Sequence, residues 1–260
     1  MKPSVRYLAL LVFTVTLFCI YYDVLYERIH YHFLYRKLGG SLKDIKSVHL
    51  FHNQLTNFVN QIAPNELEGN SADSRLQTEW YYFIARALVH RGHARICEIG
   101  FNAGHAAVTW LSALPNSTYI GFDNGFHNYT QRCVDYLKRY FGEQRIDIYY
   151  GSSDTTVWEY ANQHPWTSCD IFHVDGQHYG ELPFQDIANA KRLVASGSLI
   201  IVDDAVLSGP CERHGSFCYN PTQAWKQLNA SGLMSTAECI RLELPWRGFC
   251  FGIVGSLTSS

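Results

Sequence analysis

Three aspartates follow two apolar segments in the second half of the chain, where they could bind one metal ion. Asp175 ends the segment 170–175, and Asp203 and Asp204 follow the segment 198–202. If both segments are neighbouring parallel strands, their carboxyl ends meet at the edge where ligands bind in open α/β sheets. Three carboxylates so close would repel each other, and a divalent cation would relieve that repulsion. Ligands that are all oxygen favour Mg²⁺ or a similar hard ion.

A histidine close to this edge offers acid–base chemistry. His178 follows Asp175 on the loop that would line the same site. A metal ion there could hold a substrate hydroxyl, lower its pKa and aim its oxygen at a methyl group. His178 would then be the general base, with Asp175 as a second catalytic residue. The alternatives are a structural loop histidine, and aspartates that cap a strand and a turn without binding metal. Asp186, in the next helix, is interpreted as a solvated residue.

A glycine turn earlier in the chain predicts a ligand site of another kind. The segment Arg95–His105 has the pattern of a buried strand, a glycine turn and the start of a helix. Gly100 can adopt a positive φ and lets the backbone approach a ligand, and Gly104 allows close packing of the helix on the strand. The helix N-terminus then directs its free N–H groups at that ligand. Asp123, roughly 20 residues further on at the end of a second apolar segment, is placed to hold two ribose hydroxyls.

Two residues at this turn limit the class of ligand that could bind there. Asn102 stands where the dinucleotide fingerprint has its middle glycine, which makes room for a pyrophosphate. A ligand without a pyrophosphate therefore fits better. Glu98, just before the turn, can reach a cationic group through water or the turn amides. The alternative is a tight strand–helix turn that binds nothing.

Both sets of motifs resemble known enzymes. The glycine turn with Glu98 and Asp123 resembles motif I and the following acidic motif of the class I S-adenosylmethionine (SAM) methyltransferases. The segments 174–178 and 201–204 resemble the metal-dependent small-molecule and sugar O-methyltransferases, including the macrolide-sugar type. This resemblance covers about residues 76–255. The pair Ser196-Gly197 departs from it, because the family usually has two glycines there.

The resemblance implies two cofactors, SAM and Mg²⁺. It assigns the metal to the three aspartates Asp175, Asp203 and Asp204. It places an adenine contact around Ser152, whose alternative is a simple strand–helix turn. The SAM-binding residues that it implies are Glu98, Gly100, Asn102, Gly104, Asp123, Ser152 and Asp175.

The elements that must position these residues follow an alternating order. The resemblance implies an α/β fold with a Rossmann-like seven-stranded sheet, mostly parallel, whose last strand is antiparallel. The expected strands are residues 95–99, 119–123, 146–150, 170–175, 198–202, 239–244 and 248–254. The expected helices are residues 78–89, 106–111, 129–141, 155–163, 182–193 and 222–228. The insertion Ser208–Pro221 is expected to form a lid or substrate wall, and Trp225 either lines the acceptor pocket or packs.

Length and charge limit the other possibilities. The 260 residues suit one domain of about 200 residues plus an appendage. The net charge of −2 provides no basic face for nucleic acid. Residues 7–22 carry no charge, and residues 24–26 extend them towards the ~20 apolar residues that span a bilayer. We expect a cytosolic tail and signal-anchor helix in residues 1–26, a stem with an amphipathic helix in residues 27–75, and the catalytic domain in residues 76–260. A cleaved signal peptide is the main alternative.

Cysteines and glycosylation motifs indicate the cellular compartment in which the protein resides. Eight cysteines are more than a cytosolic protein of this size needs. Cys211 and Cys218 bracket a plausible disulfide loop, and Cys239 and Cys250 are expected on two strands of a hairpin. The remaining cysteines are interpreted as three buried thiols and a residue of the apolar N-terminal segment: Cys97, Cys133, Cys169 and Cys19. The N-glycosylation acceptors are Asn116, Asn128 and Asn229.

These observations predict a single-pass type II membrane protein with its catalytic domain in the ER or Golgi lumen. A cytosol-facing anchor and a secreted protein remain the alternatives. The expected activity is SAM-dependent O-methylation of a glycan or small molecule, assisted by metal. The rivals are a metal-free methyltransferase that uses His178 as base, an inactive scaffold with this fold, and a nucleotide-sugar-binding protein. The last would need room for a pyrophosphate at Asn102.

Overall fold

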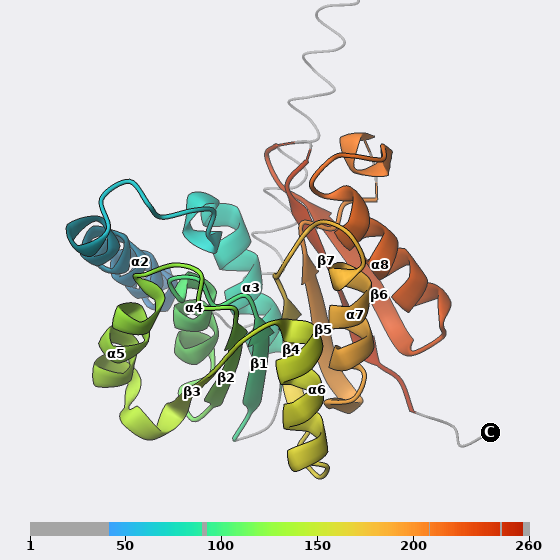
Figure 1. Cartoon of the computed structure of the whole chain (residues 1–260), viewed down its shortest axis with the longest axis horizontal. Coiled ribbons are helices and arrows are strands. Elements are labelled where there is room, and N and C mark those ends of the chain that lie inside the picture. Colours follow the sequence, from blue (N-terminus) through green and yellow to red (C-terminus); the bar gives the residue numbers. More distant parts are fainter. Residues whose placement is uncertain (1–41, 90–92, 208, 245, 257–260) are drawn as a thin grey trace, which may run out of the picture. The chain divides into compact units, whose positions relative to one another are not determined.

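The computed structural model describes residues 42–89, 93–207, 209–244 and 246–256, all of which belong to one compact unit (Figure 1). The predicted signal anchor and the first part of the predicted stem lie outside these residues. Within the described ranges, no helix is both long enough and apolar enough to cross a membrane.

A seven-stranded sheet runs through the described part of the chain, as expected (Figure 1). Its strand order is β3-β2-β1-β4-β5-β7-β6. The strands from β1 to β5 pair in parallel, and β7 lies antiparallel between β5 and β6. The strands are β1 (Arg95–Ile99), β2 (Thr118–Asp123), β3 (Ile146–Tyr150), β4 (Cys169–Val174), β5 (Val194–Asp203), β6 (Met234–Arg241) and β7 (Gly248–Val254).

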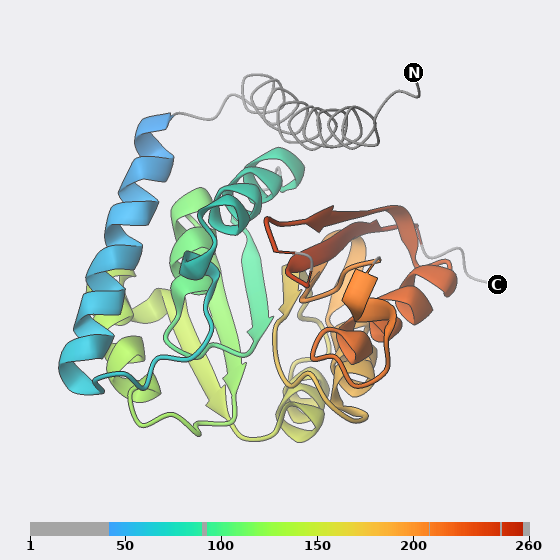
Figure 2. The same cartoon turned by 90° about the horizontal axis from the view of Figure 1, so that it is seen from above.

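Helices cover both faces of this sheet (Figures 1 and 2). The helices α6, α7 and α8 pack on one face through a shared apolar core, and α3 and α4 cover the other. The helices are α2 (Leu42–Ile62), α3 (Arg75–Leu88), α4 (His105–Ala113), α5 (Thr130–Phe141), α6 (Ser153–Gln163), α7 (Leu182–Ala190) and α8 (Tyr219–Ala230). Three short 3₁₀ segments complete the described elements: η1 (Ser71–Asp73), η2 (Glu143–Arg145) and η3 (Gly209–Glu212).

Strand alternation decides which side chains meet under α3 and α4. Successive residues of a strand point to opposite faces of the sheet. Cys97 and Ile99 join the core against α6, α7 and α8, so Glu98 between them faces α3 and α4. Glu98 pairs in register with His173 of β4, which pairs with Ile201 of β5. A buried polar pair, Glu98 and His173, therefore lies beneath α3 and α4.

The amphipathic helix of the predicted stem packs on the domain. Helix α2 buries its apolar stripe, including Ile45, Leu55 and Val59, and contacts α4. The Phe51 ring lies 4.2 Å from the ring of Tyr140 in α5, between ring centroids. The helical part of the stem thus stabilises the face that α4 covers. The predicted outer boundaries at residues 26 and 75 stay predictions.

Two expectations about the C-terminal half need adjustment. Strand β5 begins at Val194, before the Ser196-Gly197 pair that was expected to precede it, because Cys169 pairs with Val194 across an irregular register. Trp225 is 1 % exposed and belongs to the core between α8 and the sheet. It therefore packs and does not line an acceptor pocket.

Disulfides join three pairs of cysteines in the described residues. Cys211–Cys218 closes the expected loop, and Cys239–Cys250 joins the hairpin strands β6 and β7. The interpretation of Cys97 and Cys169 as separate buried thiols is wrong, because the two form a disulfide with Cα atoms 5.8 Å apart. The reason is topological: β1 and β4 are neighbours in the sheet although the two residues are 72 positions apart in sequence. Cys133 is a buried free thiol, as expected.

Candidate active site

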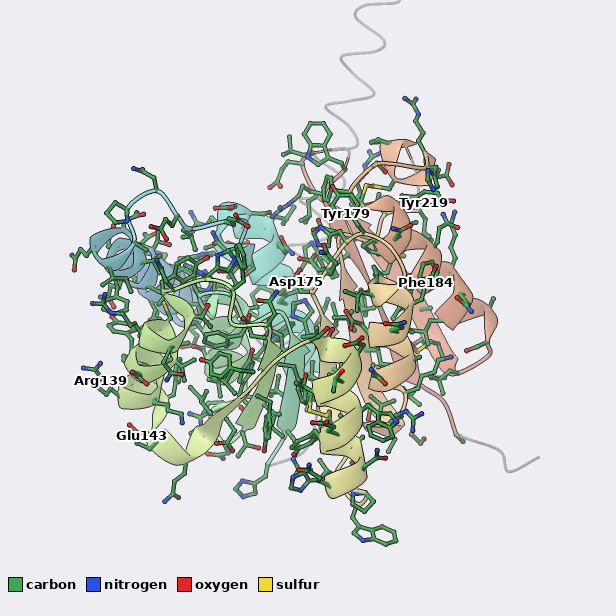
Figure 3. All side chains as sticks on the ribbon, viewed as in Figure 1. Arg139, Glu143, Asp175, Tyr179, Phe184 and Tyr219 are labelled. Carbon is green, nitrogen blue, oxygen red and sulfur yellow. A yellow bond between two sulfur atoms is a disulfide. The ribbon has the colours of Figure 1, made fainter. Side chains whose placement is uncertain are left out.

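A cleft of about 370 Å³ opens at the carboxyl ends of the parallel strands. Its lining comes from the turn after β1, the ends of β2, β3 and β4, and a segment before η1. Figure 3 shows Asp175 near the centre of the molecule, at this edge of the sheet. The predicted SAM-binding residues that line the cleft are Glu98, Gly100, Asn102, Asp123, Ser152 and Asp175. Gly104 does not line it.

The two motif glycines have separate roles. Gly100 has φ 93°, and a Cβ on it would lie 1.8 Å from the carbonyl oxygen of Asp175. Any side chain there would force the β1 turn away from the end of β4. Gly104 has φ 88° and caps α4, and a Cβ on it would lie 2.6 Å from Leu137 and from the Phe101 ring. Gly104 therefore permits close packing, as expected.

Asp123 stands at the end of β2 and is held by backbone amides. Its Oδ2 accepts a hydrogen bond from the Asn102 amide at 2.8 Å, and its Oδ1 accepts one from the Gly125 amide at 2.8 Å. The side chain is 7 % exposed and lines the cleft. These bonds fix the orientation of a carboxylate that would hold ribose hydroxyls.

Asn102 links the glycine turn to two other segments. Its φ of 54° is left-handed, a conformation that asparagine tolerates better than most residues. Its Nδ2 donates to the carbonyl oxygens of Glu68 at 3.2 Å and Gly69 at 3.0 Å. The Tyr129 hydroxyl donates to its Oδ1 at 2.6 Å. The segment of Glu68 and Gly69 is thereby held against the cofactor end of the cleft.

Glu98 was expected to reach towards a cationic group of the ligand, but its side chain is deeply buried. It is 1 % exposed, and its Oε2 accepts a hydrogen bond from the Tyr119 hydroxyl at 2.6 Å. Its Oε1 lies 3.2 Å from Nδ1 of His173. Burial, and next the charge of Glu98, raise the pKa of Tyr119, which keeps the phenol protonated and donating. Glu98 thus lines the floor of the cleft from within a buried network.

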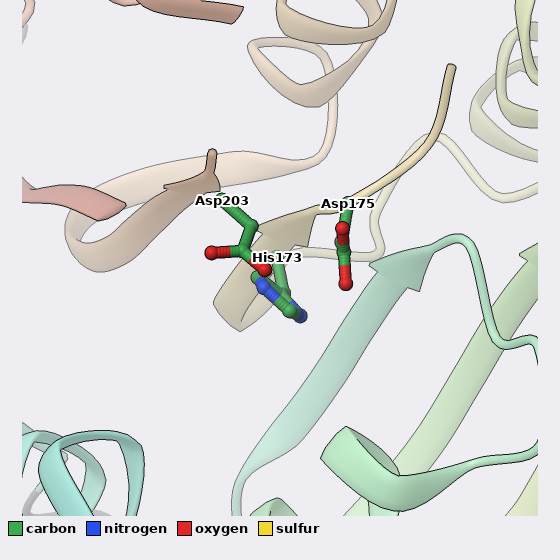
Figure 4. Close-up of side chains that lie close together, drawn as sticks. All are labelled: His173, Asp175 and Asp203. Atoms are coloured by element: carbon green, nitrogen blue, oxygen red, sulfur yellow. The ribbon is translucent and has the colours of Figure 1, made fainter. Parts of the chain in front are cut away.

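The three predicted metal ligands converge, together with two histidines. Asp175 belongs to two groups whose ligand atoms lie within 4.8 Å of one another, one with His173 and Asp203 and one with His178 and Asp204. Figure 4 shows the first group at the ends of β4 and β5. Burial, and then the charges of Asp203 and Asp204, raise the pKa of Asp175. Burial and Asp203 likewise raise the pKa of Asp204.

His178 lies at the mouth beside these carboxylates. Its Nε2 is 3.3 Å from Oδ2 of Asp204, and its side chain is 27 % exposed. Burial lowers its pKa, and the charge of Asp203 opposes that effect. The imidazole is therefore neutral near pH 7 and can accept a proton. The geometry fits a general base, and the role itself stays a prediction.

A family model described as a methyltransferase domain matches residues 97–205, which include the cofactor end of the cleft and all three aspartates. This part of the chain therefore matches a methyltransferase domain. Its fold is that of solved O-methyltransferases. No curated protein matches the sequence.

Three solved structures illustrate the likeness. An O-methyltransferase from Bacillus cereus in complex with SAH is 14 % identical with a TM-score of 0.61, covering 86 % of this chain and 96 % of that chain. TomG from Streptomyces achromogenes, an O-methyltransferase of tomaymycin synthesis in complex with SAM, is 17 % identical with a TM-score of 0.61, covering 84 % and 92 %. CalS11, a TDP-rhamnose 3′-O-methyltransferase, is 17 % identical with a TM-score of 0.51, covering 82 % and 95 %. At these identities the likeness establishes the fold.

Several residues of the methyltransferase domain site were missed by sequence reasoning. Gln77 of α3 donates through Nε2 to both carboxylate oxygens of Asp203, each at 2.8 Å. Arg247, in the β6–β7 turn, donates to Oε1 of Gln77 at 3.5 Å. Burial disfavours the charge of Arg247, but the carboxylates of Asp204, Asp203 and Asp175 raise its pKa above the ordinary value. Arg247 therefore offsets part of the negative charge at the acceptor end.

The insertion after β5 forms one wall of the acceptor end. The Cys211–Cys218 disulfide packs with Val206 and Phe217 in a small apolar cluster. The Phe217 ring lies 5.7 Å from the His178 ring, between centroids. A lid or a substrate wall was expected for this insertion, and that role stays a prediction.

The interpretation of Asp186 as solvated is wrong. Asp186 is 0 % exposed, and its Oδ1 accepts a hydrogen bond from the Ser153 hydroxyl at 2.6 Å. Burial raises its pKa to about 6. A Cβ on Gly176 would lie 3.0 Å from its Oδ2, so Asp186 supports the loop that follows β4 from below. The helical pattern placed it on the polar face, but that face packs against the N-terminus of α6.

Proposed function

We propose that this domain transfers the methyl group of SAM to a hydroxyl oxygen of a small-molecule or glycan acceptor, with the assistance of a divalent metal ion. The observation that carries the proposal is the position of Asp175, Asp203, Asp204 and His178 at the mouth of the cofactor cleft. The O-methyltransferase neighbours support oxygen as the acceptor atom.

The cofactor end supplies the binding groups. Asp123 is oriented to hold the ribose hydroxyls, and the α4 N-terminus directs amides towards the carboxylate of the cofactor. Asn102 occupies the space that a pyrophosphate would need, which favours SAM over a nucleotide sugar. Ser152 lines the same cleft at the end of β3, where we propose the adenine contact.

The residues at the acceptor end fit a divalent cation. Asp175, Asp203 and Asp204 would hold it, because their mutual repulsion raises the pKa values of Asp175 and Asp204 beyond what burial alone does. The cation would lower the pKa of an acceptor hydroxyl and fix its oxygen. Carboxylate oxygens are ligands that divalent cations of this kind accept readily.

We propose that His178 accepts the proton of the acceptor hydroxyl. In the reaction, the acceptor oxygen forms a bond to the methyl carbon, the bond between that carbon and the SAM sulfur breaks, and the hydroxyl proton leaves. His178 Nε2 faces the Asp204 carboxylate, which orients the ring and stabilises the imidazolium that forms, so Nδ1 is the nitrogen that accepts the proton. The Phe217 ring packs beside the imidazole, with ring centroids 5.7 Å apart.

A metal-free mechanism is the second candidate. Arg247 lies close enough to the carboxylates of Asp203, Asp204 and Asp175 for their charges to raise its pKa. It could supply part of the positive charge that a metal would otherwise bring. In that case His178 with Asp204 performs the base chemistry alone. Loss of activity on chelation separates the two mechanisms.

For location, we propose a type II membrane protein with this domain in the lumen of the secretory pathway. Three disulfides support an oxidising compartment. The acceptor asparagines of the glycosylation motifs have exposed side chains: Asn116, Asn128 and Asn229. The proposed anchor lies in residues 1–26. A domain located in the lumen would meet glycans, which favours a glycan hydroxyl as the acceptor.

The first experiment is calorimetric titration of SAM into the purified full-length protein, with Mg²⁺ and with EDTA. We expect micromolar binding in both conditions, because the metal residues lie beyond the cofactor groups. Methyl transfer to a panel of glycan and small-molecule acceptors should then require Mg²⁺. A folded, disulfide-intact protein that does not bind SAM would overturn the activity and leave a scaffold role.

The location has its own test. Treatment of the full-length protein from cells with an N-glycosidase should increase its gel mobility, and replacing Asn116, Asn128 and Asn229 together with glutamine should abolish the change. Absence of any glycan on the wild-type protein would contradict a lumenal domain.

A further inference from the structure

A buried histidine next to the carboxylates has one ring nitrogen without a partner. His173, the fifth of the six residues of β4, is 0 % exposed, and its Nδ1 faces Glu98 at 3.2 Å while its Nε2 makes no hydrogen bond. Leaving a buried polar group unpaired is destabilising. An imidazole in this position therefore calls for a partner, and Figure 4 shows it beside Asp175 and Asp203.

We propose that His173 is a metal ligand, which together with Asp175 and Asp203 forms a site of mixed nitrogen and oxygen donors. Such a site prefers a first-row transition ion such as Mn²⁺ or Zn²⁺ over Mg²⁺, because imidazole is a softer ligand than carboxylate or water. This inference rests on the metal-assisted reaction proposed above, and changes both the ligand set and the ion.

Strand geometry brings the three donors together. His173 and Asp175 lie two positions apart along β4 and its end, so they point to the same face of the sheet. His173 pairs with Ile201 of β5, two positions before Asp203. One ligand atom from each of the three side chains lies within 4.8 Å of the other two. A single ion between them would contact all three.

Glu98 and two aromatic rings hold the imidazole in place. Nδ1 of His173 lies 3.2 Å from Oε1 of Glu98, on the far side of the ring from Nε2. A carboxylate behind one nitrogen is the usual arrangement for a metal-binding histidine, because it fixes the ring and increases the basicity of the other nitrogen. The rings of Tyr81 and Trp110 pack edge-on against the imidazole, at centroid distances of 5.1 and 5.5 Å.

The carboxylate of Asp203 retains capacity for an ion. Its oxygens accept hydrogen bonds from Nε2 of Gln77, and the Tyr81 hydroxyl also bonds to this carboxylate. An ionised carboxylate has about four lone-pair sites, so a free lone pair remains. Gln77 therefore orients Asp203 without replacing a cation.

The simpler explanation is a core histidine paired with Glu98. That explanation accounts for Nδ1 but leaves Nε2 buried without a partner. The other candidate histidine, His178, already lies 3.3 Å from Asp204 and is 27 % exposed, so water can satisfy it. The unsatisfied nitrogen thus distinguishes the inner group from the outer one.

The test is electron spin-echo envelope modulation of Mn²⁺ bound to the full-length protein, which detects a coordinated nitrogen directly. We expect ¹⁴N modulation in the wild type. It should persist in His178→Gln, the matched control, and disappear in His173→Gln. Calorimetry should show Mn²⁺ binding at least tenfold weaker in His173→Gln, as expected when a ligand is removed, and tighter binding of Mn²⁺ than of Mg²⁺ by the wild type.

A second measurement avoids the risk that His173→Gln fails to fold. Protein with the His178→Gln change is labelled with ¹⁵N-histidine, and the modulation should shift to ¹⁵N frequencies. Absence of Mn²⁺ binding, absence of nitrogen modulation, or its loss in His178→Gln would overturn the proposal. SAM binding is measured on the same samples, so a failure of the methyltransferase activity is distinguished from a failure of the metal site.

Discussion

At the cofactor end of the cleft, Asp123 accepts hydrogen bonds from two backbone amides. At the acceptor end, Asp175 faces two other carboxylates, and the nearest cation is Arg247. The backbone thus satisfies the first carboxylate before any ligand arrives, whereas the second set carries excess negative charge. This difference indicates that the cofactor end is preorganised, and it is the charge pattern expected if a cation completes the acceptor end, as proposed above.

The largest expected effect comes from pushing the glycine turn away from the end of β4. Gly100→Ala would place a Cβ in a steric clash with the Asp175 carbonyl oxygen. We expect a loss of about 3 kcal/mol or more in unfolding free energy and loss of SAM binding. Urea unfolding and calorimetry measure both. Gly180→Ala, at a glycine with φ 70° and open space around its Cβ position, is the matched control for positive φ alone. Equal effects of the two changes would contradict the packing argument.

Asp203→Asn addresses the acceptor end. Removing one negative charge while keeping the shape should lower turnover on the order of 100-fold, which corresponds to about 2.7 kcal/mol. SAM affinity should change little, because Asp203 does not line the cofactor cleft. Steady-state kinetics and calorimetry on the same preparation give the two values. Full activity of Asp203→Asn in EDTA would remove the metal from the mechanism.

Asp123→Ala addresses the cofactor end. Losing charge-assisted hydrogen bonds to the ribose should weaken SAM binding about tenfold or more. The rate with saturating SAM should fall less than the affinity. Since Asp123 also accepts hydrogen bonds from the Asn102 and Gly125 amides, Asp123→Asn serves as the control that keeps the size of the side chain. An unchanged SAM affinity in both variants would refute the ribose assignment.

The last prediction concerns the pH dependence of stability and a histidine pair behind the cofactor end. Burial lowers the pKa of His52 to about 4 and that of His105 to about 3. Unfolded histidine binds its proton near pH 6.5. Between pH 6.5 and about 4 the unfolded state therefore holds more protons, and stability falls as the pH falls. Each histidine contributes up to about 1.4 kcal/mol per pH unit.

Urea unfolding at pH 7, 6 and 5 measures this slope, and His52→Gln should reduce it. Asp186, whose pKa is raised to about 6, changes stability in the opposite direction. The comparison is therefore the slope of the variant against that of the wild type. Identical slopes would exclude His52 as a contributor.

Local patterns predicted the parts of the site that lie close together in sequence. The glycine turn from Gly100 to Gly104, the β6–β7 hairpin and the Cys211–Cys218 loop depend on neighbouring residues, and the structure has all three. The strand ends carrying Asp175 and Asp203 were also found, because carboxylates that end apolar strands are a visible signal.

The contacts that the sequence did not predict depend on the order of strands in the sheet and on packing between residues far apart in sequence. His173 resembles any residue of a buried strand until Glu98 is known to lie beside it. Gln77 reaches Asp203 from a helix far away in sequence, and Arg247 reaches Gln77 from a distant turn. The Cys97–Cys169 disulfide likewise requires β1 to be next to β4. A single sequence offered no signal for these contacts, since none of them leaves a local periodicity.

The hydrogen bonds of Asn102 have a consequence for the time course of the reaction. The segment of Glu68 and Gly69 that Asn102 holds also lines the cleft. We predict that these two bonds open before the spent cofactor leaves by this side of the cleft. Replacing Asn102 with glycine should then shorten the residence time of the product, as measured by its dissociation rate.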